Sequence, residues 1–475
     1  MKDPVSKIRR LAIFFIVSVQ IISLYIFIFV IQHKTKSRWR KAFMKKVSWI
    51  NQIMSPISIN QLLAQLGPSP VFAQNGYRNT TIPKHFPRLE QFYERMERLA
   101  MQHPELISLE VIGSSTTLGL PIYALRISDN PQIEEDESSI LFSGLHHARE
   151  PMGTLMCLRI AEWLAANYWV RPGIKRLVDE LEIWVVPVVN PDGYKYMLDN
   201  FVPYPWWRKN LRDNDRDGVF NPTIDGVDLN RNYDFNWRQG GEGNPASWFY
   251  RGEAPFSENE VAALKKLALR ENIMAGISFH SYGEVVLFPW GNYYPAPDHR
   301  IIVEIASKLA EQMQKLYGSE PYSVLPLNGR VGQSSVWMYG RLRAIDYILE
   351  LGNEHFPDRY AAERILNEGL KAIRYFLNRM LGAGIRGHVM DALEGTPVVA
   401  TIRIKGLEAD YVYPRQSEKH FGRFERLLSP GEYTLEVIAF GYQTRILKRV
   451  NVKQYQPTQI EIYLNRMESF PAAHH

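Results

Sequence analysis

The stretch SSILFSGLHHARE, residues 138–150, decides how the rest of the chain is interpreted. It begins with the apolar residues Ile140 to Phe142, passes through a turn of small residues, and ends with His147 and, three positions later, Glu150. Neutral imidazole and carboxylate oxygen are both good ligands for zinc. A strand end that presents the two together is a candidate metal site, although the same spacing also occurs on solvated loops.

Length and composition indicate a globular protein with more than one domain. The chain has 475 residues, of which 45% are hydrophobic and 22% are charged, so we expect two folded domains with extensions. The net charge is +6, but much of the basic excess lies before residue 50. In the rest of the chain the basic and acidic residues are close to equal in number, and this charge balance does not indicate nucleic acid as a partner. The single cysteine, Cys157, lies in an apolar helical pattern and is interpreted as an inert core thiol.

The N-terminal region, residues 1–46, is expected to be a basic-flanked membrane anchor or signal segment. Its hydrophobic stretch, 11–32, carries no charge and is long enough for a helix to cross a bilayer. An uncleaved anchor is our first interpretation, but Ser69 to Ala73 resembles a signal-peptidase site, so the topology stays open. We expect a membrane-anchored or exported protein whose main domain is extracytoplasmic. Residues 47–79, rich in Ser, Asn, Gln and Pro, are expected to be a linker.

Residues 80–382 alternate between helical periodicity and apolar, β-branched segments. This alternation predicts an α/β fold with a mixed, mainly parallel sheet and helices on both faces. Ligands of such sheets gather at the carboxyl ends of the strands, where His147, Asn190 and His280 lie. Strands are expected at 106–113, 121–128, 140–142, 181–190, 273–280 and 346–352, and helices at 89–106, 152–169, 257–270, 301–318 and 361–380.

The segment 385–465 has a different character. Short alternating stretches are separated by Gly and Pro, and no helical pattern interrupts them. This pattern predicts a small all-β sandwich, followed by a tail at 466–475.

Five further motifs follow HARE, residues 147–150. They are NPDGY at 190–194, WRKN at 207–210, GVDLNRNY at 226–233, FHSYG at 279–283 and LEL at 349–351. In this order, over about residues 80 to 382, they resemble the zinc metallocarboxypeptidase family, with a carboxypeptidase A/B-like catalytic domain. Each motif alone is weak, and together, at plausible strand ends and loops, they are specific.

The resemblance implies that His147, Glu150 and His280 bind one zinc ion. Three protein ligands leave the fourth position for water, as a catalytic site requires. His146 is interpreted as a neighbour, because the family's spacing selects His147.

The resemblance also implies catalytic roles for Glu350 and Arg208. Glu350 matches the general base, which takes a proton from the zinc-bound water and returns it to the leaving amine. Arg208 matches the arginine that stabilises the developing oxyanion with its fixed charge.

Substrate contacts are implied as well. Asn230 and Arg231 match the clamp for the terminal carboxylate, which a planar guanidinium can bind through two hydrogen bonds. Arg149 resembles an auxiliary substrate arginine, although a solvated charge is the alternative, and Tyr282 would line the site behind His280.

Two positions depart from the family pattern. The family's mobile tyrosine aligns with Asn328, and Tyr322 lies out of register with it. Ser335 aligns with the residue at the floor of the family's specificity pocket. Enzymes that prefer aromatic side chains have an apolar residue at this position, and enzymes that prefer basic side chains have Asp. The preferred side chain therefore stays open.

Asp213, Asp215 and Asp217 precede Gly218 with the spacing of a calcium loop. The twelfth position is Ile224 and not Glu, so the segment is not a full EF-hand loop. Two interpretations stay open. The segment is either a calcium site that Asp225 or a carbonyl completes, or a solvated acidic loop.

The C-terminal segment, with GHVMD at 387–391 and SPGEY at 429–433, resembles the transthyretin-like regulatory domain of some carboxypeptidases. No catalytic role is assigned to it.

The sequence thus predicts a zinc carboxypeptidase that acts on the C-termini of peptides or proteins. The first alternative is a zinc amidohydrolase of the same fold that acts on cell-wall peptides or modified protein tails. A non-catalytic binding protein is disfavoured, because every ligand, the base and the clamp are present. The oligomeric state stays open.

Overall fold

The computed structural model describes residues 82–290, 294–327 and 331–467, which belong to one compact unit. The expected membrane or signal segment, the linker, Asn328 and most of the tail lie outside these residues. No helix of the described part combines the length and apolarity needed to span a membrane. Membrane association and localisation therefore stay predictions.

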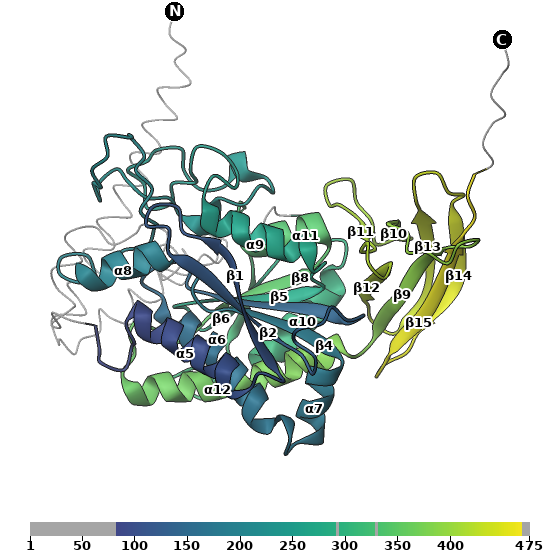
Figure 1. The fold of residues 1–475 in the computed structure, drawn as a ribbon, viewed down its shortest axis with the longest axis horizontal. Coiled ribbons are helices and arrows are strands. Elements are labelled where there is room, and N and C mark those ends of the chain that lie inside the picture. Colours follow the sequence, from purple (N-terminus) through teal and green to yellow (C-terminus); the bar gives the residue numbers. More distant parts are fainter. Residues whose placement is uncertain (1–81, 291–293, 328–330, 468–475) are drawn as a thin grey trace, which may run out of the picture. The chain divides into compact units, whose positions relative to one another are not determined.

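A mixed sheet forms the centre of the larger part of the molecule (Figure 1). Within the described residues its eight strands run in the order β1-β2-β4-β3-β5-β8-β6-β7. The central strands β4, β3, β5 and β8 are mutually parallel, whereas β1, β2 and β6 pair antiparallel with their neighbours toward the centre. The strands are β1 (Ile107–Ser114), β2 (Pro121–Ile127), β3 (Ser138–Gly144), β4 (Leu181–Val186), β5 (Ala275–His280), β6 (Val285–Phe288), β7 (Ser323–Pro326) and β8 (Ile345–Glu350).

Burial explains why the central strands are so apolar. Strands β3, β4 and β5 are buried at every position, as expected for parallel strands covered on both faces. Alternate side chains enter different cores: Ile140 and Phe142 pack on one face of the sheet and Leu141 packs on the other. The prediction of a mixed, mainly parallel sheet is confirmed.

Helices cover both faces of this sheet, as predicted (Figure 1). One face carries α5 (Leu89–Gln102), α6 (Pro151–Tyr168), α7 (Pro172–Asp179), α10 (His299–Glu311) and α12 (Arg359–Met380), and the other carries α9 (Asn259–Arg270) and α11 (Ser334–Leu342). Cys157 is buried in α6, as expected for a core thiol.

Two predicted elements were wrong in their extent. The helix expected at 301–318 is α10, which ends at Glu311. The strand expected at 181–190 ends at Val186, and the expected turn at Asn190 is the start of helix α8 (Pro191–Asp199). The Asn190 side chain accepts a hydrogen bond from the Gly193 N–H, and Pro191 occupies the first helical turn. Both are helix-start features, because Asn caps free N–H groups and Pro needs no partner there. Helices α7 and α11 and strands β6 and β7 were not predicted.

The C-terminal part forms a small β-sandwich with its own hydrophobic core, as predicted. In the described residues its sheets have the strand orders β11-β10-β13-β14 and β12-β9-β15. Ile385, Val389, Ile402, Leu435 and Ile462 contribute to the core between them. The strands are β9 (Gly384–Asp391), β10 (Thr401–Ile404), β11 (Arg415–Gln416), β12 (Arg423–Leu427), β13 (Gly431–Ile438), β14 (Arg445–Val452) and β15 (Pro457–Leu464). The transthyretin-like assignment stays a prediction.

Buried ion pairs join the sandwich to the larger part. Asp298, just before α10, lies 2.9 Å from Arg343 Nε at the end of α11 and 2.8 Å from Arg426 Nη2 on β12. Tyr339 donates a third hydrogen bond, of 2.8 Å, to the same carboxylate. Burial opposes ionisation of Asp298, but the two arginines hold its pKa below the usual range. These residues are buried, so each charge depends on its partners.

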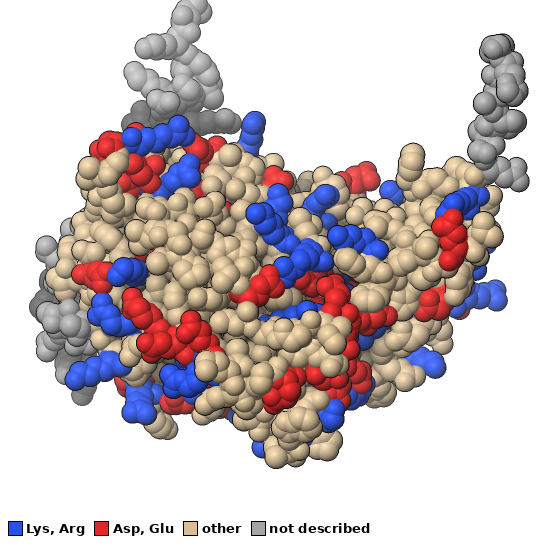
Figure 2. Space-filling model, in the orientation of Figure 1, with Lys and Arg blue, Asp and Glu red and all other residues tan. Residues whose placement is uncertain are grey.

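The same junction carries exposed charges. Figure 2 shows acidic and basic side chains gathered where the sandwich meets the larger part. His388 of β9 lies 2.7 Å from Asp136, which also lies 3.4 Å from Arg423. Because Asp136 is exposed, these pairs contribute less to stability than the buried Asp298 cluster does.

Replacing Asp298 with Ala should lower the free energy of unfolding by about 3–5 kcal/mol, because it leaves two buried guanidinium groups without their shared partner. Urea denaturation of the full chain measures this. The control is Glu311→Ala, which breaks an exposed pair with Lys308 and should change stability by less than about 1 kcal/mol. Equal effects of the two substitutions would contradict the importance of the buried cluster.

Candidate metal centre and active site

Three parallel strands end at the same edge of the sheet. The register places Gly144 of β3 beside Phe279 of β5, and His280 of β5 beside Glu350 of β8. His147 and Glu150 follow directly after β3. The sheet therefore brings together residues that are far apart in the sequence, as expected for the carboxyl edge of a parallel sheet.

A close contact of α6 with the sheet fixes the position of Glu150. A Cβ atom at Gly153, in the first turn of α6, would lie 2.6 Å from the Phe279 carbonyl oxygen, and one at Gly144 would lie 2.7 Å from the backbone of Gly153. Side chains at these glycines would push the helix away from β3 and β5. Glu150, which immediately precedes α6, is thereby held against the end of β5.

The chain reaches His147 through a strained backbone conformation. Leu145 is buried and has a φ of 58°, in the left-handed region that non-glycine residues rarely occupy. Such strain persists only where the surrounding structure holds it, and it occurs often at functional sites. Here it turns the chain so that His146 and His147 follow the end of β3 at the sheet edge.

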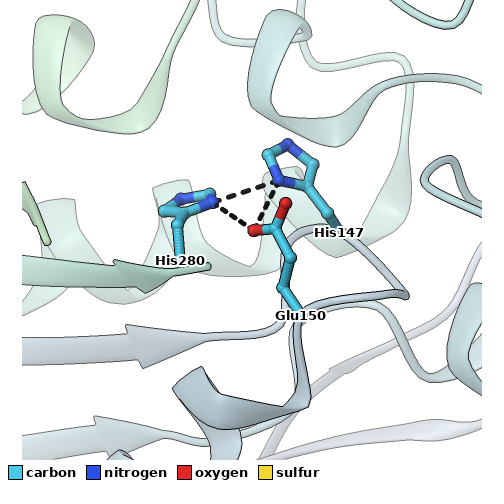
Figure 3. Close-up of side chains that lie close together, drawn as sticks. All are labelled: His147, Glu150 and His280. Carbon is cyan, nitrogen blue, oxygen red and sulfur yellow. Dashed lines mark hydrogen bonds and ion pairs between the residues drawn. The ribbon is translucent and has the colours of Figure 1, made fainter. Parts of the chain in front are cut away.

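His147, Glu150 and His280 converge on one point (Figure 3). Nδ1 of each histidine lies 2.9 Å from Glu150 Oε2, and the two Nδ1 atoms lie 3.1 Å apart. All three side chains are buried. Two imidazole nitrogens and a carboxylate oxygen directed at a common centre are the donor set of a catalytic zinc site. The residues therefore fit the predicted ion.

The electrostatics of the three residues suit a cation. Burial opposes ionisation of Glu150, but the two histidines hold its pKa well below the usual range. Burial lowers the pKa of His280 to about 4, which favours the neutral imidazole. A negative carboxylate and a neutral imidazole are the protonation states that metal ligands require.

The other ring nitrogens of both histidines have polar neighbours. His280 Nε2 lies 3.0 Å from Ser278 Oγ and 3.3 Å from Asn230 Nδ2. His147 Nε2 lies 3.3 Å from Asp228 Oδ1. Such contacts fix the ring orientation, and a carboxylate neighbour also makes the ligand more basic.

Asp228 was missed by the sequence analysis, although it lies inside the quoted motif GVDLNRNY. Besides His147 it contacts Arg208, whose Nε and Nη2 lie 2.9 Å and 2.8 Å from Asp228 Oδ2. Arg208 Nη1 also lies 3.8 Å from Glu150 Oε1. Burial opposes ionisation of Asp228, but Arg208 and Arg231 hold its pKa far below the usual range. One carboxylate thus orients both a candidate zinc ligand and the predicted oxyanion arginine.

Asn230 and Arg231 lie on the short helix η1 (Leu229–Arg231), next to the metal candidates. The Asp228 side chain accepts a hydrogen bond from the Asn230 N–H and caps this turn. Asn230 Oδ1 accepts a hydrogen bond from the Ser334 N–H at the start of α11. The guanidinium carbons of Arg208 and Arg231 lie 5.3 Å and 5.6 Å from the centre of the Phe249 ring, so the two cations flank one aromatic side chain.

The structure places the remaining predicted residues around this centre. Glu350 ends β8 and is partly exposed beside His280. Arg149 is buried and donates a hydrogen bond of 3.2 Å to the Trp206 carbonyl, which disfavours the solvated-charge alternative. Tyr282 is half-exposed.

Ser335 is fully buried, and its hydroxyl donates a hydrogen bond to Asp346 of β8. Burial raises the pKa of Asp346 to about 7, and this hydrogen bond opposes the shift. The Ser335 hydroxyl is therefore already used inside the protein.

His146 lies next to the triad. Its ring stacks on that of His280, with centres 5.5 Å apart, and its Nε2 lies 2.9 Å from the Tyr233 hydroxyl. These contacts agree with its interpretation as a neighbour of the ligands.

The acidic loop brings three carboxylates close together. Asp213, Asp215 and Asp217 each place a carboxylate oxygen within 4.8 Å of the others. Asp213 accepts hydrogen bonds from the Arg216 and Gly218 N–H groups. The Asp225 carboxylate accepts hydrogen bonds from the N–H groups of Asn214 and Asn221. Calcium binding stays a prediction.

Comparison with known proteins supports the resemblance. The model of a family described as "Zinc carboxypeptidase" matches residues 92–372. A zinc carboxypeptidase of Saccharothrix mutabilis subsp. capreolus is 29% identical over 57% of this chain and 63% of its own length. Carboxypeptidase A2 of Mus musculus is 31% identical over 62% of this chain and 67% of its own length. The chain thus spans about two thirds of these relatives.

A solved structure shows the same fold. The crystal structure of carboxypeptidase A from Helicoverpa armigera superposes with a TM-score of 0.55 and 23% identity, covering 61% of this chain and 72% of that one.

Replacing Asp228 with Asn should weaken zinc binding by about 10- to 100-fold, because the His147 ring loses its charged neighbour. Competition with a chromogenic chelator measures the zinc affinity. Asp234→Asn, at an exposed position of the same segment, is the control and should bind zinc as the unaltered protein does. An unchanged zinc affinity of Asp228→Asn would contradict the role of Asp228.

Proposed function

The chain belongs to the zinc carboxypeptidase family, and on that premise we propose that it is a zinc-dependent carboxypeptidase that removes C-terminal residues from peptides or proteins. One observation carries the proposal: the metal triad lies within contact distance of Asn230, and Arg231 follows it in the chain. A hydrolytic centre and a carboxylate clamp at one place are what an exopeptidase needs.

The clamp is the basis of the selectivity for chain ends. Arg231 can bind a terminal carboxylate through two parallel hydrogen bonds. The Asn230 amide is held by Ser334 and lies 3.3 Å from His280 Nε2, so a carboxylate bound here places the last peptide bond near the triad. An internal peptide segment has no carboxylate to offer.

Arg208 acts on the scissile carbonyl. His147, Glu150 and His280 would hold zinc, which would supply the positive charge that polarises this carbonyl and lowers the pKa of a water molecule. Arg208 is fixed by Asp228, so its positive charge is in place before the reaction begins. Preorganised charge of this kind stabilises the oxyanion of the transition state without further rearrangement.

Glu350 moves the proton. The strand register supports this role, because it pairs Glu350 at the end of β8 with the candidate ligand His280. Glu350 takes a proton from the attacking water and gives it to the nitrogen of the leaving amino acid, whose departure completes the hydrolysis.

Release of amino acids from a peptide library with randomised C-termini tests this function. We expect single residues to be released from free carboxyl ends, with little release from the same peptides after C-terminal amidation. Removal of zinc with a chelator should abolish release, and added zinc should restore it. If zinc-loaded protein releases no residue from any free carboxyl end, the proposal is wrong.

Replacing Glu350 with Gln should lower kcat by about 10²- to 10⁴-fold, because the amide cannot accept the proton. Zinc content should stay at that of the unaltered protein, since Glu350 is not one of the proposed ligands. Glu354→Gln, at an exposed position shortly after β8, is the matched control. A Glu350→Gln protein that turns over peptides at the unaltered rate would refute the assignment of the base.

A further inference from the structure

His146 is a buried histidine beside the metal triad, and it is not a metal ligand, base or clamp residue. Its Nε2 lies 2.9 Å from the Tyr233 hydroxyl, and its Nδ1 lies 3.3 Å from Ser278 Oγ. Ser278 Oγ also lies 3.0 Å from Nε2 of the candidate ligand His280. These four side chains therefore form an uninterrupted series of polar contacts that ends at a metal ligand.

The strands and turns around the triad hold this series in place. Ser278 and His280 are two residues apart on β5, so their side chains leave the same face of the sheet. His146 follows β3, and Tyr233 follows η1, where its N–H donates a hydrogen bond to the Gly332 carbonyl. All four side chains are at most 1% exposed. Because they are shielded from solvent, they must find hydrogen-bond partners in one another.

Binding of zinc at Nδ1 of His280 would decide where the remaining ring proton lies. A neutral imidazole carries one proton, so a ring that offers Nδ1 to a metal keeps its proton on Nε2 and is a donor there. Nε2 lies near Ser278 Oγ and near Asn230 Nδ2. An amide nitrogen cannot accept a hydrogen bond, so the Ser278 oxygen is the acceptor.

The rest of the series follows from the number of donors and acceptors. The Ser278 hydroxyl has one proton, which it donates to Nδ1 of His146. His146 then carries its own proton on Nε2 and donates it to the Tyr233 oxygen. The hydrogen bonds therefore run in one direction, from His280 to Tyr233.

His146 matters because a serine hydroxyl can also point the other way. If Ser278 had no acceptor, its proton could turn toward Nε2 of His280 and stabilise the tautomer that carries its proton on Nδ1. That tautomer cannot bind zinc through Nδ1. By accepting the Ser278 proton, His146 removes this competing arrangement.

We propose that His146 is a positioning residue that acts through Ser278 to hold His280 in the tautomer that presents Nδ1 to zinc. Tyr233 in turn keeps the His146 ring in the orientation that this role needs. The inference rests on the zinc site of the proposed function and adds a residue on which zinc affinity depends, although it is not a ligand.

The zinc affinity of the full chain, measured by competition with a chromogenic chelator, tests this role without turnover. His146→Phe keeps a ring beside His280 but loses both nitrogens, and Ser278→Ala removes only the hydroxyl. Each should weaken zinc binding by about 10- to 100-fold. Ser139→Ala is the control, because it removes another buried hydroxyl of the sheet, bonded to Glu182, and it should bind zinc as the unaltered protein does.

The double variant shows whether His146 acts through Ser278. If it does, the double variant should bind zinc about as tightly as the weaker of the two single variants, because the same hydrogen bond is lost in each. Two independent structural effects would multiply instead. His146→Asn, whose amide oxygen can accept the Ser278 proton, should bind zinc more tightly than His146→Phe does.

Tyr233→Phe tests the far end of the series and is the milder change if His146→Phe does not fold. Loss of the hydroxyl should weaken zinc binding by about two- to tenfold. Tyr347→Phe is the matched control, because it loses a buried hydroxyl that is bonded to the Ile302 carbonyl, and its zinc affinity should not change.

An unchanged zinc affinity of His146→Phe or of Ser278→Ala would overturn the inference, and so would a double variant whose loss equals the product of the single losses. Failure of the proposed function looks different. Peptides would then stay uncleaved although zinc binding still responds to these variants.

Discussion

The contact of Gly153 with the carbonyl oxygen of Phe279 is the constraint on which the site depends. Only a residue without a side chain lets α6 begin so close to the end of β5. Because Glu150 is the last residue before α6, this contact sets the distance between its carboxylate and His280. The parallel register of β5 and β8 then adds Glu350 beside His280. Backbone packing thus determines where the candidate ligands and base lie.

Asp228 connects the candidate metal ligands to the residues proposed to bind the substrate. Its carboxylate contacts His147 and Arg208 and caps the turn that carries Asn230. Asn230 in turn binds the first residue of α11, whose far end contacts Asp298 through Tyr339 and Arg343. Arg426 of the sandwich shares the Asp298 carboxylate. Hydrogen bonds, ion pairs and helix α11 therefore connect the β-sandwich to the proposed clamp.

Much of the fold could be predicted because its signals are local. The apolar runs of β3, β5 and β8 and the periodic helices α9 and α12 are long and buried, so pattern and structure agree. The start of α8 was interpreted as a turn because Asn, Pro, Asp and Gly are common both in turns and at the start of helices. The residues after Gly193 continue as a helix, which only the structure shows. The short strands β6 and β7 depend on their neighbours for stability and carry no comparable pattern.

The residues of the candidate site also divide into those that the sequence predicts and those that only the structure shows. The metal triad was found because each ligand lies in a recognisable motif, and the structure brings His147, Glu150 and His280 together. Asp228 was missed because an aspartate inside a loop motif gives no sign that its partners are His147 and Arg208. The hydroxyl of Ser335 was expected at a pocket floor, but its hydrogen bond to Asp346 could only be seen in three dimensions.

The proposed function depends most on the metal triad, and anomalous X-ray diffraction from crystals at the zinc absorption edge tests this triad directly. One strong peak is expected at about 2.0–2.1 Å from Nδ1 of His147 and of His280, and at about 2.0–2.2 Å from a Glu150 oxygen. A map of zinc-loaded protein without a peak between these three side chains, or with zinc held by other residues, would contradict the proposed function.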